Sequence, residues 1–231
     1  KIMEKTIRDN LEQVYKNLES ACTRSGRDRN QVTLIAVSKT KPLEDLQMAY
    51  QLGVRDFGEN KVQEILQKAP QMPEDVRFHM IGHLQRNKVR QVLPYISMIH
   101  SVDSVRLALE IQQEAKRMDR IVDVLLEVNV AGEESKFGFA PEEVMEALSM
   151  ISSFSHIRVC GLMTIAPFVE ISEQNRPVFQ KLFQLYVDIK RKNIDNVSMS
   201  VLSMGMTGDY EVAVEEGATM IRVGTGIFGA R

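Results

Sequence analysis

Short β-branched or aliphatic runs recur eight times along the chain, and each is followed by a polar or glycine-containing turn and an amphipathic stretch. Eight strands that alternate with helices are the pattern of a closed parallel (β/α)8 barrel. The predicted strands are Val32–Val37, Val54–Phe57, Arg77–Ile81, Ser97–His100, Val122–Val128, Arg158–Thr164, Ser198–Leu202 and Met220–Val223. We therefore predict a TIM barrel of the α/β class.

A long amphipathic segment, from Met3 to Ser25, precedes the first predicted strand, and Gly26 lies just past its end. This segment has no preceding strand, and the chain stops directly after the turn of the eighth strand. We expect the extra N-terminal helix to take the place of the missing eighth outer helix. The other predicted helices are Leu43–Leu52, Lys61–Lys68, Gln85–Leu93, Ser104–Met118, Pro141–Ser152, Glu173–Lys192 and Tyr210–Glu216.

The length of 231 residues suits one barrel, so we expect a single domain over residues 1–231. Hydrophobic residues make up 44% and charged residues 26%, which indicates a globular protein with a substantial core. Lysine plus arginine (29) nearly balances aspartate plus glutamate (31), giving a net charge of −2. This balance argues against nucleic acid or an anionic membrane surface as a partner.

Cys22 and Cys160 lie far apart and have no metal-ligand spacing, so we expect two reduced thiols and a reducing compartment. No apolar run approaches the roughly 18 residues that a membrane span needs, and no charged-then-apolar leader opens the chain. Together these features predict a cytoplasmic protein that is not attached to a membrane. The absence of an obvious apolar surface stretch favours a monomer.

Lys39 directly follows the apolar run of the first predicted strand. In such barrels chemistry gathers at the carboxyl ends of the strands, and desolvation there favours the neutral, nucleophilic form of a lysine amine. The alternative is a surface lysine whose stem packs on apolar neighbours while its ammonium stays in water. Lys41 and Lys136 are weaker candidates for the same chemistry.

The turn after the eighth predicted strand contains Gly224, Thr225 and Gly226. Turns after strands seven and eight often bind a phosphate through backbone N–H groups that small residues leave uncovered. Ser203, at the end of the seventh strand, can supply a hydroxyl to the same anion. The alternative is a pair of glycine-rich turns with no ligand.

Several other side chains at strand ends are unusual for ordinary turns. Arg222 on strand eight is costly inside an apolar barrel unless a ligand or carboxylate pairs with it. His83 is either an active or a structural histidine, and Asn60 is either a pocket residue or a helix cap. Met163 and Met204 are either core filler or walls for a flat aromatic ligand. The four histidines show no metal-ligand spacing, and we expect no metal.

A series of short segments, in the same order, resembles the single-domain pyridoxal phosphate homeostasis proteins, which share the fold-type III barrel of alanine racemase. The segments are Ala-Val-Ser-Lys-Thr-Lys-Pro (36–42), Phe-Gly-Glu-Asn-Lys-Val-Gln-Glu (57–64), His-Met-Ile-Gly-His-Leu-Gln-Arg-Asn-Lys (79–88), Gly-Leu-Met-Thr-Ile (161–165), Leu-Ser-Met-Gly-Met-Thr (202–207) and Arg-Val-Gly-Thr-Gly-Ile-Phe-Gly (222–229). The sequence departs from the family pattern at 207–210, where a serine is expected.

The resemblance implies a role for each of these residues with pyridoxal phosphate. Lys39 would form a Schiff base with the cofactor's aldehyde, and Arg222 would hydrogen-bond its pyridine nitrogen. Ser203, Gly224 and Thr225 would hold the phosphate. The further residues implied to line the pocket are Asn60, His83 and Met163.

The resemblance also implies a protein that buffers pyridoxal phosphate and delivers it to apo-enzymes, with little or no catalysis. An arginine facing the pyridine nitrogen keeps it unprotonated and weakens the ring as an electron sink. Racemases of this fold take a tyrosine base from a second domain, for which the chain leaves no room. The alternatives are a pyridoxal-phosphate-dependent amino-acid racemase or lyase, and a regulatory protein whose partner affinity depends on cofactor occupancy.

Overall fold

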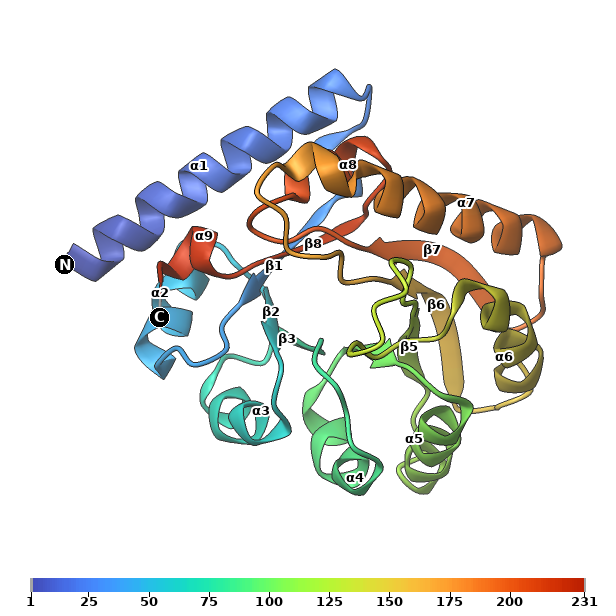
Figure 1. Cartoon of the computed structure of the whole chain (residues 1–231). Helices are drawn as coiled ribbons and strands as arrows, with labels where there is room; N and C mark the ends of the chain where they lie inside the picture. Colours follow the sequence, from blue (N-terminus) through green and yellow to red (C-terminus); the bar gives the residue numbers. More distant parts are fainter. Residues whose placement is uncertain (1, 231) are drawn as a thin grey trace.

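Eight parallel strands form a closed barrel in sequence order in a computed structural model, which describes residues 2–230 (Figure 1). The strands are β1 (Thr33–Val37), β2 (Asp56–Glu59), β3 (Arg77–Met80), β4 (Met98–Val102), β5 (Val122–Glu127), β6 (Ile157–Met163), β7 (Val197–Ser203) and β8 (Met220–Val223). The barrel closes where β1 pairs with β8, with Leu34 opposite Ile221 and Ala36 opposite Val223. The predicted (β/α)8 barrel is confirmed.

Helices surround the strands on the outside of the barrel (Figure 1). They are α1 (Ile2–Arg24), α2 (Leu43–Gln51), α3 (Val62–Lys68), α4 (Val89–Val92), α5 (Val105–Arg117), α6 (Val144–Ile151), α7 (Arg176–Lys192), α8 (Tyr210–Glu215) and α9 (Thr225–Phe228). Short 3-10 turns flank several of them, at Arg29–Gln31, Ala69–Gln71, Arg86–Lys88, Leu93–Tyr95, Pro141–Glu143 and Ser172–Asn175.

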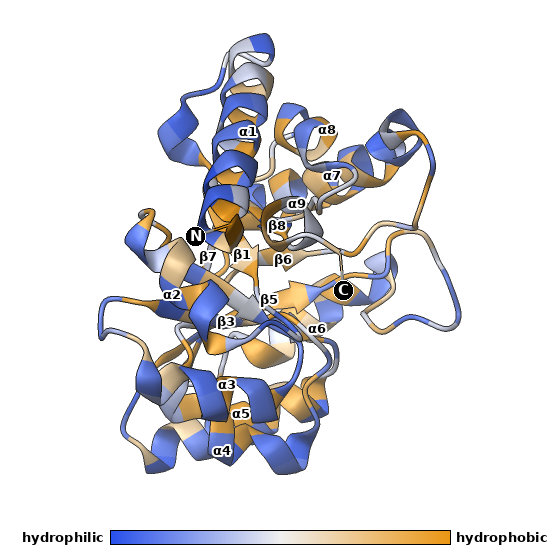
Figure 2. Ribbon diagram, turned by 90° about the vertical axis from the view of Figure 1, so that its left-hand side faces the viewer, coloured by the Kyte–Doolittle hydropathy of each residue, from blue (hydrophilic) through white to orange (hydrophobic). Residues whose placement is uncertain are grey.

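The helix α5 illustrates how the local sequence specifies these elements. The side chain of Ser104 caps it by accepting a hydrogen bond of 3.1 Å from the backbone N–H of Leu107. Leu107, Ile111 and Ala115 recur at helical spacing and are buried against the strands. Strands are mostly hydrophobic and the outer faces of the helices mostly hydrophilic in Figure 2.

Several bounds differ from the sequence-based expectation; β4, for example, ends at Val102 and not at the predicted His100. Two other differences are informative. The second strand lies two residues further along than predicted, because the buried carboxylate of Glu59 continues the ladder opposite Met80. A charged residue at the end of an apolar run predicts a turn, because the sequence does not show which buried group pairs with it. The segment predicted as one helix over Gln85–Leu93 is a single α-helical turn between two 3-10 turns, the second of which contains Pro94.

The N-terminal helix α1 packs along the outside of the barrel against α2, α8 and α9 (Figure 1). Its buried face consists of Ile7, Leu11, Val14 and Leu18, which join the main hydrophobic core. Since α9 after β8 is only four residues long, α1 fills the position of the eighth outer helix. The prediction for the N-terminal segment is confirmed.

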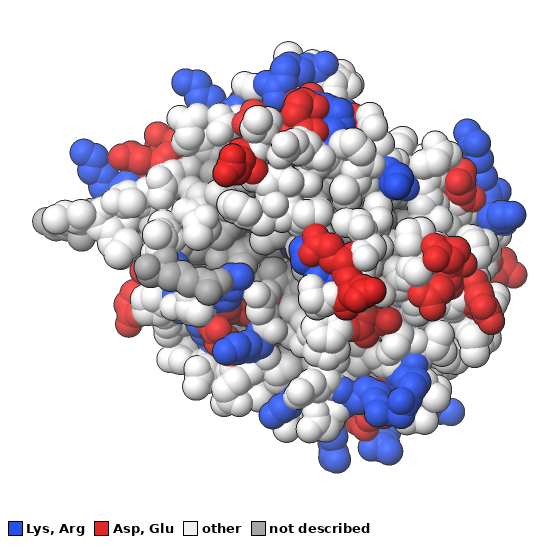
Figure 3. Space-filling model, in the orientation of Figure 1, with Lys and Arg blue, Asp and Glu red and all other residues white. Residues whose placement is uncertain are grey.

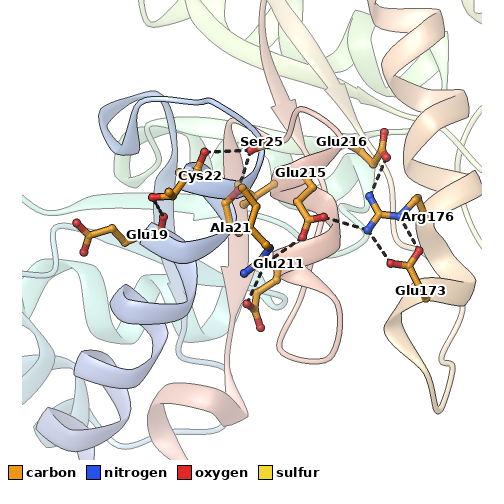
Figure 4. A network of polar contacts seen from close by, with 12 residues as sticks. Glu19, Ala21, Cys22, Ser25, Glu173, Arg176, Glu211, Glu215 and Glu216 are labelled. Carbon is orange, nitrogen blue, oxygen red and sulfur yellow. Dashed lines mark hydrogen bonds and ion pairs between the residues drawn. The ribbon is translucent and has the colours of Figure 1, made fainter.

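Ion pairs reinforce the seam between α1, α8 and α7. Arg176 at the start of α7 contacts Glu173, Glu215 and Glu216 at distances of 2.6 to 3.1 Å (Figure 4). Glu215 also contacts Arg24 of α1 at 3.0 Å. These side chains are partly exposed, so each ion pair contributes at most about 1 kcal/mol to the stability of the fold.

Cys22 and Cys160 are buried free thiols. Within residues 2–230, no helix combines the length and the hydropathy that crossing a bilayer would require. Basic and acidic side chains are interspersed around the face in Figure 3, and this face is hollowed near its middle.

Candidate functional site

A cavity of about 510 Å³ opens at the carboxyl ends of the strands, a size typical of small-ligand sites. Its polar lining comes from the turn after β1, the loop between β7 and α8, and the turn after β8. Its apolar lining comes mainly from the loop after β6, which contains Ile165, Pro167, Phe168 and Val169. The side chain of Phe168 is 95% exposed at the rim.

Four of the predicted site residues line this one cavity. They are Lys39, Arg222, Gly224 and Thr225. Lys136, the weaker candidate for the reactive amine, lines it as well, whereas Lys41 instead donates a hydrogen bond of 3.2 Å to the carbonyl oxygen of Ala230. The cavity is therefore the place where the predicted amine, guanidinium and glycine turn meet.

Hydrogen bonds hold the turn that carries Lys39 on both sides. Before it, the carbonyl oxygen of Ser38 accepts a hydrogen bond of 2.8 Å from the ammonium of Lys68. After it, the backbone N–H of Thr40 donates to the carboxylate of Glu64 at 2.8 Å, with Thr40 in the left-handed region at φ 64°. A β-branched residue there is strained, so this turn depends on its anchors.

A buried charge cluster lies behind the Lys39 turn. One carboxylate oxygen of Glu59 accepts hydrogen bonds from Lys68 at 2.8 Å and from the Ser38 hydroxyl at 3.1 Å. The other, Oε1, has no hydrogen-bond partner among the described residues. Burial raises the pKa of Glu59 to about 7, although Lys68 opposes the shift. The sequence offered only one signal for this cluster, the spacing of Glu64 and Lys68 one helical turn apart.

Arg222 is only 3% exposed and both of its terminal nitrogens are engaged. One donates to the hydroxyl of Ser203 at 2.5 Å and the other to the carbonyl oxygen of Thr164 at 2.8 Å. Burial lowers the pKa of Arg222 to about 10, and the nearby carboxyl of Glu127 opposes the shift. The guanidinium is thus charged at neutral pH and rigidly oriented.

Thr207 is a site residue that the sequence analysis missed. Its hydroxyl lies in the cavity wall and accepts hydrogen bonds from the backbone N–H groups of Gly224 (3.3 Å) and Gly226 (3.2 Å). A Cβ atom at Gly226 would lie 2.9 Å from a methyl group of Val223 and 3.2 Å from the methyl of Thr207. A larger residue would therefore require these methyl groups to move. Because the Thr207 oxygen accepts both N–H groups, its own hydroxyl hydrogen remains to be donated, which suits an anion.

Ser203 and Met163 lie beneath the cavity and do not line it. Ser203 is fully buried, and its hydroxyl is bonded to Arg222 and to His100. The assignment of Ser203 to a phosphate stays a prediction, and the hydroxyl-bearing residues that line the cavity are Thr207 and Thr225. Met163 is fully buried in a small cluster with Leu125 and Cys160.

His83 and Asn60 also lie outside the lining of this cavity. The Nδ1 atom of His83 lies 3.0 Å from a carboxylate oxygen of Asp103, and its ring stacks on Phe137 with centroids 3.8 Å apart. It lines a neighbouring cleft above β3 and β4. Asn60 is half-buried and its backbone packs against Gly82, where a Cβ atom would lie 2.4 Å from the Asn60 carbonyl oxygen. Their roles stay predictions.

The cavity offers the groups that a flat, phosphorylated aromatic aldehyde would need. The amine of Lys39, the guanidinium of Arg222 and the hydroxyl-bearing residues Thr207 and Thr225 line it together. Apolar side chains cover the remaining wall. The residues present therefore fit pyridoxal phosphate. Among the described residues no cluster of histidine, cysteine or carboxylate side chains is arranged to hold a metal ion.

The model of the family described as "Alanine racemase, N-terminal domain" matches residues 10–231. This match assigns the barrel to the class of alanine-racemase N-terminal domains. The pyridoxal phosphate homeostasis protein of Aquifex aeolicus is 43% identical over 224 residues, which cover 96% of this chain and 97% of that protein. The chain therefore belongs to the family of pyridoxal phosphate homeostasis proteins.

Two solved structures are similar over nearly the whole chain. A protein from Bifidobacterium adolescentis, described only as an unknown protein, is 36% identical with a TM-score of 0.93, and the match covers 99% of this chain and 96% of that one. PipY from Synechococcus elongatus, solved with pyridoxal phosphate bound, is 33% identical with a TM-score of 0.84. That match covers 96% of this chain and 100% of PipY.

Proposed function

We propose that this chain binds pyridoxal phosphate at the barrel mouth and holds it reversibly on Lys39. It thereby limits the free aldehyde and releases the cofactor to apo-enzymes. The single observation that carries the proposal is the convergence of Lys39, Arg222, Gly224 and Thr225 on one cavity of about 510 Å³. Membership of a family whose members are named for pyridoxal phosphate homeostasis supports the same reading.

Each residue of the cavity has a distinct role in this proposal. Pyridoxal phosphate, when bound, supplies an aldehyde that condenses reversibly with an amine. Lys39 provides the amine, on a turn fixed by its two backbone hydrogen bonds. Arg222 donates toward the pyridine nitrogen, and Thr225 and the hydroxyl of Thr207 donate toward the phosphate. Gly224, whose backbone N–H donates to Thr207, keeps the turn beside the phosphate free of a side chain. We keep Asn60, His83, Met163 and Ser203 as proposed supporting residues of the pocket.

The electrostatics of the mouth favour storage of the cofactor over catalysis. Arg222, with a pKa of about 10, is a cation at neutral pH. A cation facing the ring nitrogen disfavours protonation there, because two positive charges in contact repel. The electron-accepting power that racemases and lyases need is therefore reduced.

Proton-transfer groups other than Lys39 and Lys136 are scarce in the wall as well. Among the described residues that line the cavity there is no tyrosine, histidine or cysteine. The carboxylate of Asp209 lines it, but its oxygens accept hydrogen bonds from the backbone of Met206 and from Asn175, at 2.8 and 2.9 Å. We therefore propose a non-catalytic carrier, with an amino-acid racemase or lyase as the second candidate.

An absorbance titration with pyridoxal phosphate tests the proposal. Wild-type protein is expected to develop a visible absorption band, and borohydride followed by peptide mass spectrometry is expected to label Lys39. Lys39→Ala should lose the band, whereas Lys136→Ala, which alters the second lysine of the same cavity, should keep it. A wild-type protein without a band, or label on another lysine in the wild type, would overturn the assignment.

Three further measurements distinguish a carrier from an enzyme and from a regulatory protein. Loaded protein is expected to restore activity to an apo-transaminase faster than its cofactor dissociates into buffer. Exchange of the α-proton of amino acids in deuterated water should be no faster than with free cofactor, and a robust exchange would favour the racemase or lyase. A protein partner that binds only one occupancy state would favour the regulatory role.

We also propose that the carrier acts as a monomer in the cytoplasm. The buried free thiols of Cys22 and Cys160 suit a reducing compartment. The interspersed charges of the face in Figure 3 give it no single-sign field. Light scattering coupled to gel filtration is expected to give the mass of one chain, 26.3 kDa, with and without cofactor, and a doubled mass would contradict the monomer.

A further inference from the structure

A continuous line of buried polar side chains crosses the barrel interior beneath Arg222. It runs from the mouth to the opposite, amino-terminal end of the strands, and every member is at most 7% exposed. Its members, in order, are Arg222 of β8, Ser203 of β7, His100 of β4, His79 of β3 and Asp56 of β2. The four links between neighbours measure 2.5, 2.9, 2.9 and 2.9 Å.

The two ends of this line fix the direction of every hydrogen bond in it. A guanidinium can only donate, so the Ser203 oxygen accepts from Arg222 and its own hydrogen goes to Nδ1 of His100. His100 must then carry its proton on Nε2 and donate to Nδ1 of His79. His79 in turn donates from Nε2 to the carboxylate of Asp56, which can only accept.

The far end of the line is anchored by a second arginine. Arg77 donates from two nitrogens to the two carboxylate oxygens of Asp56, at 2.9 and 2.8 Å. Burial alone would raise the pKa of Asp56, but the hydrogen bonds from His79 and Arg77 lower it to about 2. Asp56 therefore stays ionised, and the acceptor end of the line is permanent at neutral pH.

Reversing the hydrogen bonds between the histidines and Ser203 would leave the Ser203 hydroxyl hydrogen without an acceptor among the described residues. If His79 were a cation, it would donate to both neighbours, and His100 would donate to the Ser203 oxygen, which Arg222 already addresses. The hydroxyl hydrogen of Ser203 would then need a third partner, and the described residues record only Arg222 and His100 at that atom. Burial, with His79 and Arg222 nearby, also lowers the pKa of His100 well below its usual value.

We propose that Ser203, His100, His79 and Asp56 form a positioning relay for Arg222. The inference rests on the proposed function, because the role of Arg222 toward the cofactor belongs to it. The relay fixes one terminal nitrogen of the guanidinium, and the Thr164 carbonyl fixes the other. Of the five N–H groups of arginine two are used in this way, so the others remain for a ligand in a set plane.

The relay also makes the two ends of the barrel interdependent. A ligand that draws on the Arg222 guanidinium changes the strength of its bond to Ser203, and each further bond in a polarised chain responds to its neighbour. Binding of pyridoxal phosphate at the mouth is therefore expected to change the hydrogen bonding of His79, which contacts Asp56 and does not line the cavity. A merely structural pair of histidines would not respond in this way.

Nitrogen NMR of histidine-labelled wild-type protein tests the relay without any substitution. Both His79 and His100 are expected to be neutral with the proton on Nε2, and the His79 signals are expected to shift when pyridoxal phosphate is added. A proton on Nδ1 of either ring would overturn the relay. A His79 signal unchanged by a cofactor that demonstrably binds would overturn it equally.

The variant His100→Leu tests the positioning role by a spectroscopic readout. It removes the acceptor of Ser203, so the absorption maximum of the bound cofactor should move and its Kd should rise about tenfold, as expected for one lost buried hydrogen bond. Borohydride should still label Lys39. The matched control, His156→Leu, alters a half-exposed surface histidine and should leave both quantities at wild-type values.

The outcomes show whether the relay or the proposed function has failed. Failure of wild-type protein to bind the cofactor would overturn the proposed function. A folded His100→Leu protein with the wild-type absorption maximum and Kd would overturn the relay alone. Circular dichroism checks that the variant folds, and if it does not, the NMR measurement on the wild type decides the question.

Discussion

The ammonium of Lys68 donates a hydrogen bond of 2.8 Å to the carbonyl oxygen of Ser38, the residue that precedes Lys39. The same ammonium contacts Glu59 at 2.8 Å and Glu64 at 2.7 Å. Lys68, the last residue of α3, thus links the unit formed by β2 and α3 to the turn after β1. The proposed reactive amine depends on a residue that does not line its cavity.

Replacement of Lys68 by methionine should therefore destabilise the protein strongly. Met preserves the stem but leaves the carboxyl of Glu59 buried without its cation, a loss of about 3–5 kcal/mol for a broken buried pair. Urea unfolding followed by circular dichroism measures it. Lys181→Met, at an exposed lysine on α7, serves as the control and should change the unfolding free energy by less than about 0.5 kcal/mol.

The double variant Lys68→Met with Glu59→Gln isolates the cause. Because it removes both buried charges, it should recover part of the loss of the single variant. Equal instability of the single and double variants would show that the packing of the Lys68 stem, and not its charge, holds the Lys39 turn. In that case the electrostatic account of the turn would be wrong.

Gly226→Ala should weaken the proposed phosphate end of the site. The new methyl group would lie 2.9 Å from Val223 and 3.2 Å from Thr207, so the Thr207 hydroxyl or the turn must shift. We expect the Kd for pyridoxal phosphate to rise about tenfold, with a smaller change for the phosphate-free aldehyde pyridoxal. Fluorescence or absorbance titration with both ligands measures this.

Gly208→Ala is the matched control for the glycine turn. Gly208 lines the same cavity, yet an added Cβ atom there meets nothing within 4 Å. Its Kd values should equal those of the wild type. If both alanine variants bound equally well, the requirement for glycine at 226 would be confined to folding.

The buried carboxyl of Glu127 predicts a pH dependence of stability. Burial, with Asp103 nearby, raises its pKa in the folded protein from 4.5 to about 7. The folded state then holds this proton more tightly than the unfolded state does. The contribution to stability is full below pH 4.5 and is lost as pH rises to about 7.

Glu127→Gln should remove this pH dependence, because glutamine stays neutral. At about pH 8 the variant should be more stable than the wild type by up to about 3 kcal/mol, and the two should converge below about pH 5. Chemical unfolding across this range measures the difference, with the exposed Glu142→Gln as control. A variant less stable than the wild type at pH 8 would show that the ionised carboxylate is needed beside Arg222.

Features that depend on a local period could be predicted from the sequence. The alternation of apolar runs and amphipathic segments indicated the barrel, and the unpaired first helix indicated how its ring is completed. Lys39 and Arg222 could be located because chemistry gathers where parallel strands end. The glycines at 224 and 226 indicated the turn, but the sequence did not show that their N–H groups both donate to Thr207.

Features that depend on which partner a side chain finds could not be predicted. Ser203 stands at a strand end like a phosphate ligand, yet it faces the interior and joins Arg222 to His100. His83 has the sequence context of a pocket residue, but Asp103 and Phe137 hold it at a neighbouring cleft. Such choices are set by contacts between residues far apart in the sequence.

Arg222→Gln tests the proposed reason for storage of the cofactor without catalysis. Glutamine can still donate toward Ser203 but carries no charge, so a pyridine nitrogen facing it can be protonated at lower cost. A protonated ring is the stronger electron sink. We therefore expect the variant to exchange the α-proton of alanine in deuterated water about tenfold faster than the wild type, the change expected for a shift of about one pKa unit.

Borohydride labelling provides the internal check on this prediction. Borohydride should label Lys39 in the Arg222→Gln protein as in the wild type, which shows that the site is still loaded. A loaded variant whose exchange rate equals that of the wild type would mean that the ring nitrogen is not what limits the chemistry. The scarcity of proton-transfer groups in the wall would then be the remaining physical reason for the proposed weak catalysis, and Phe168→Tyr on the rim would be the next variant to measure.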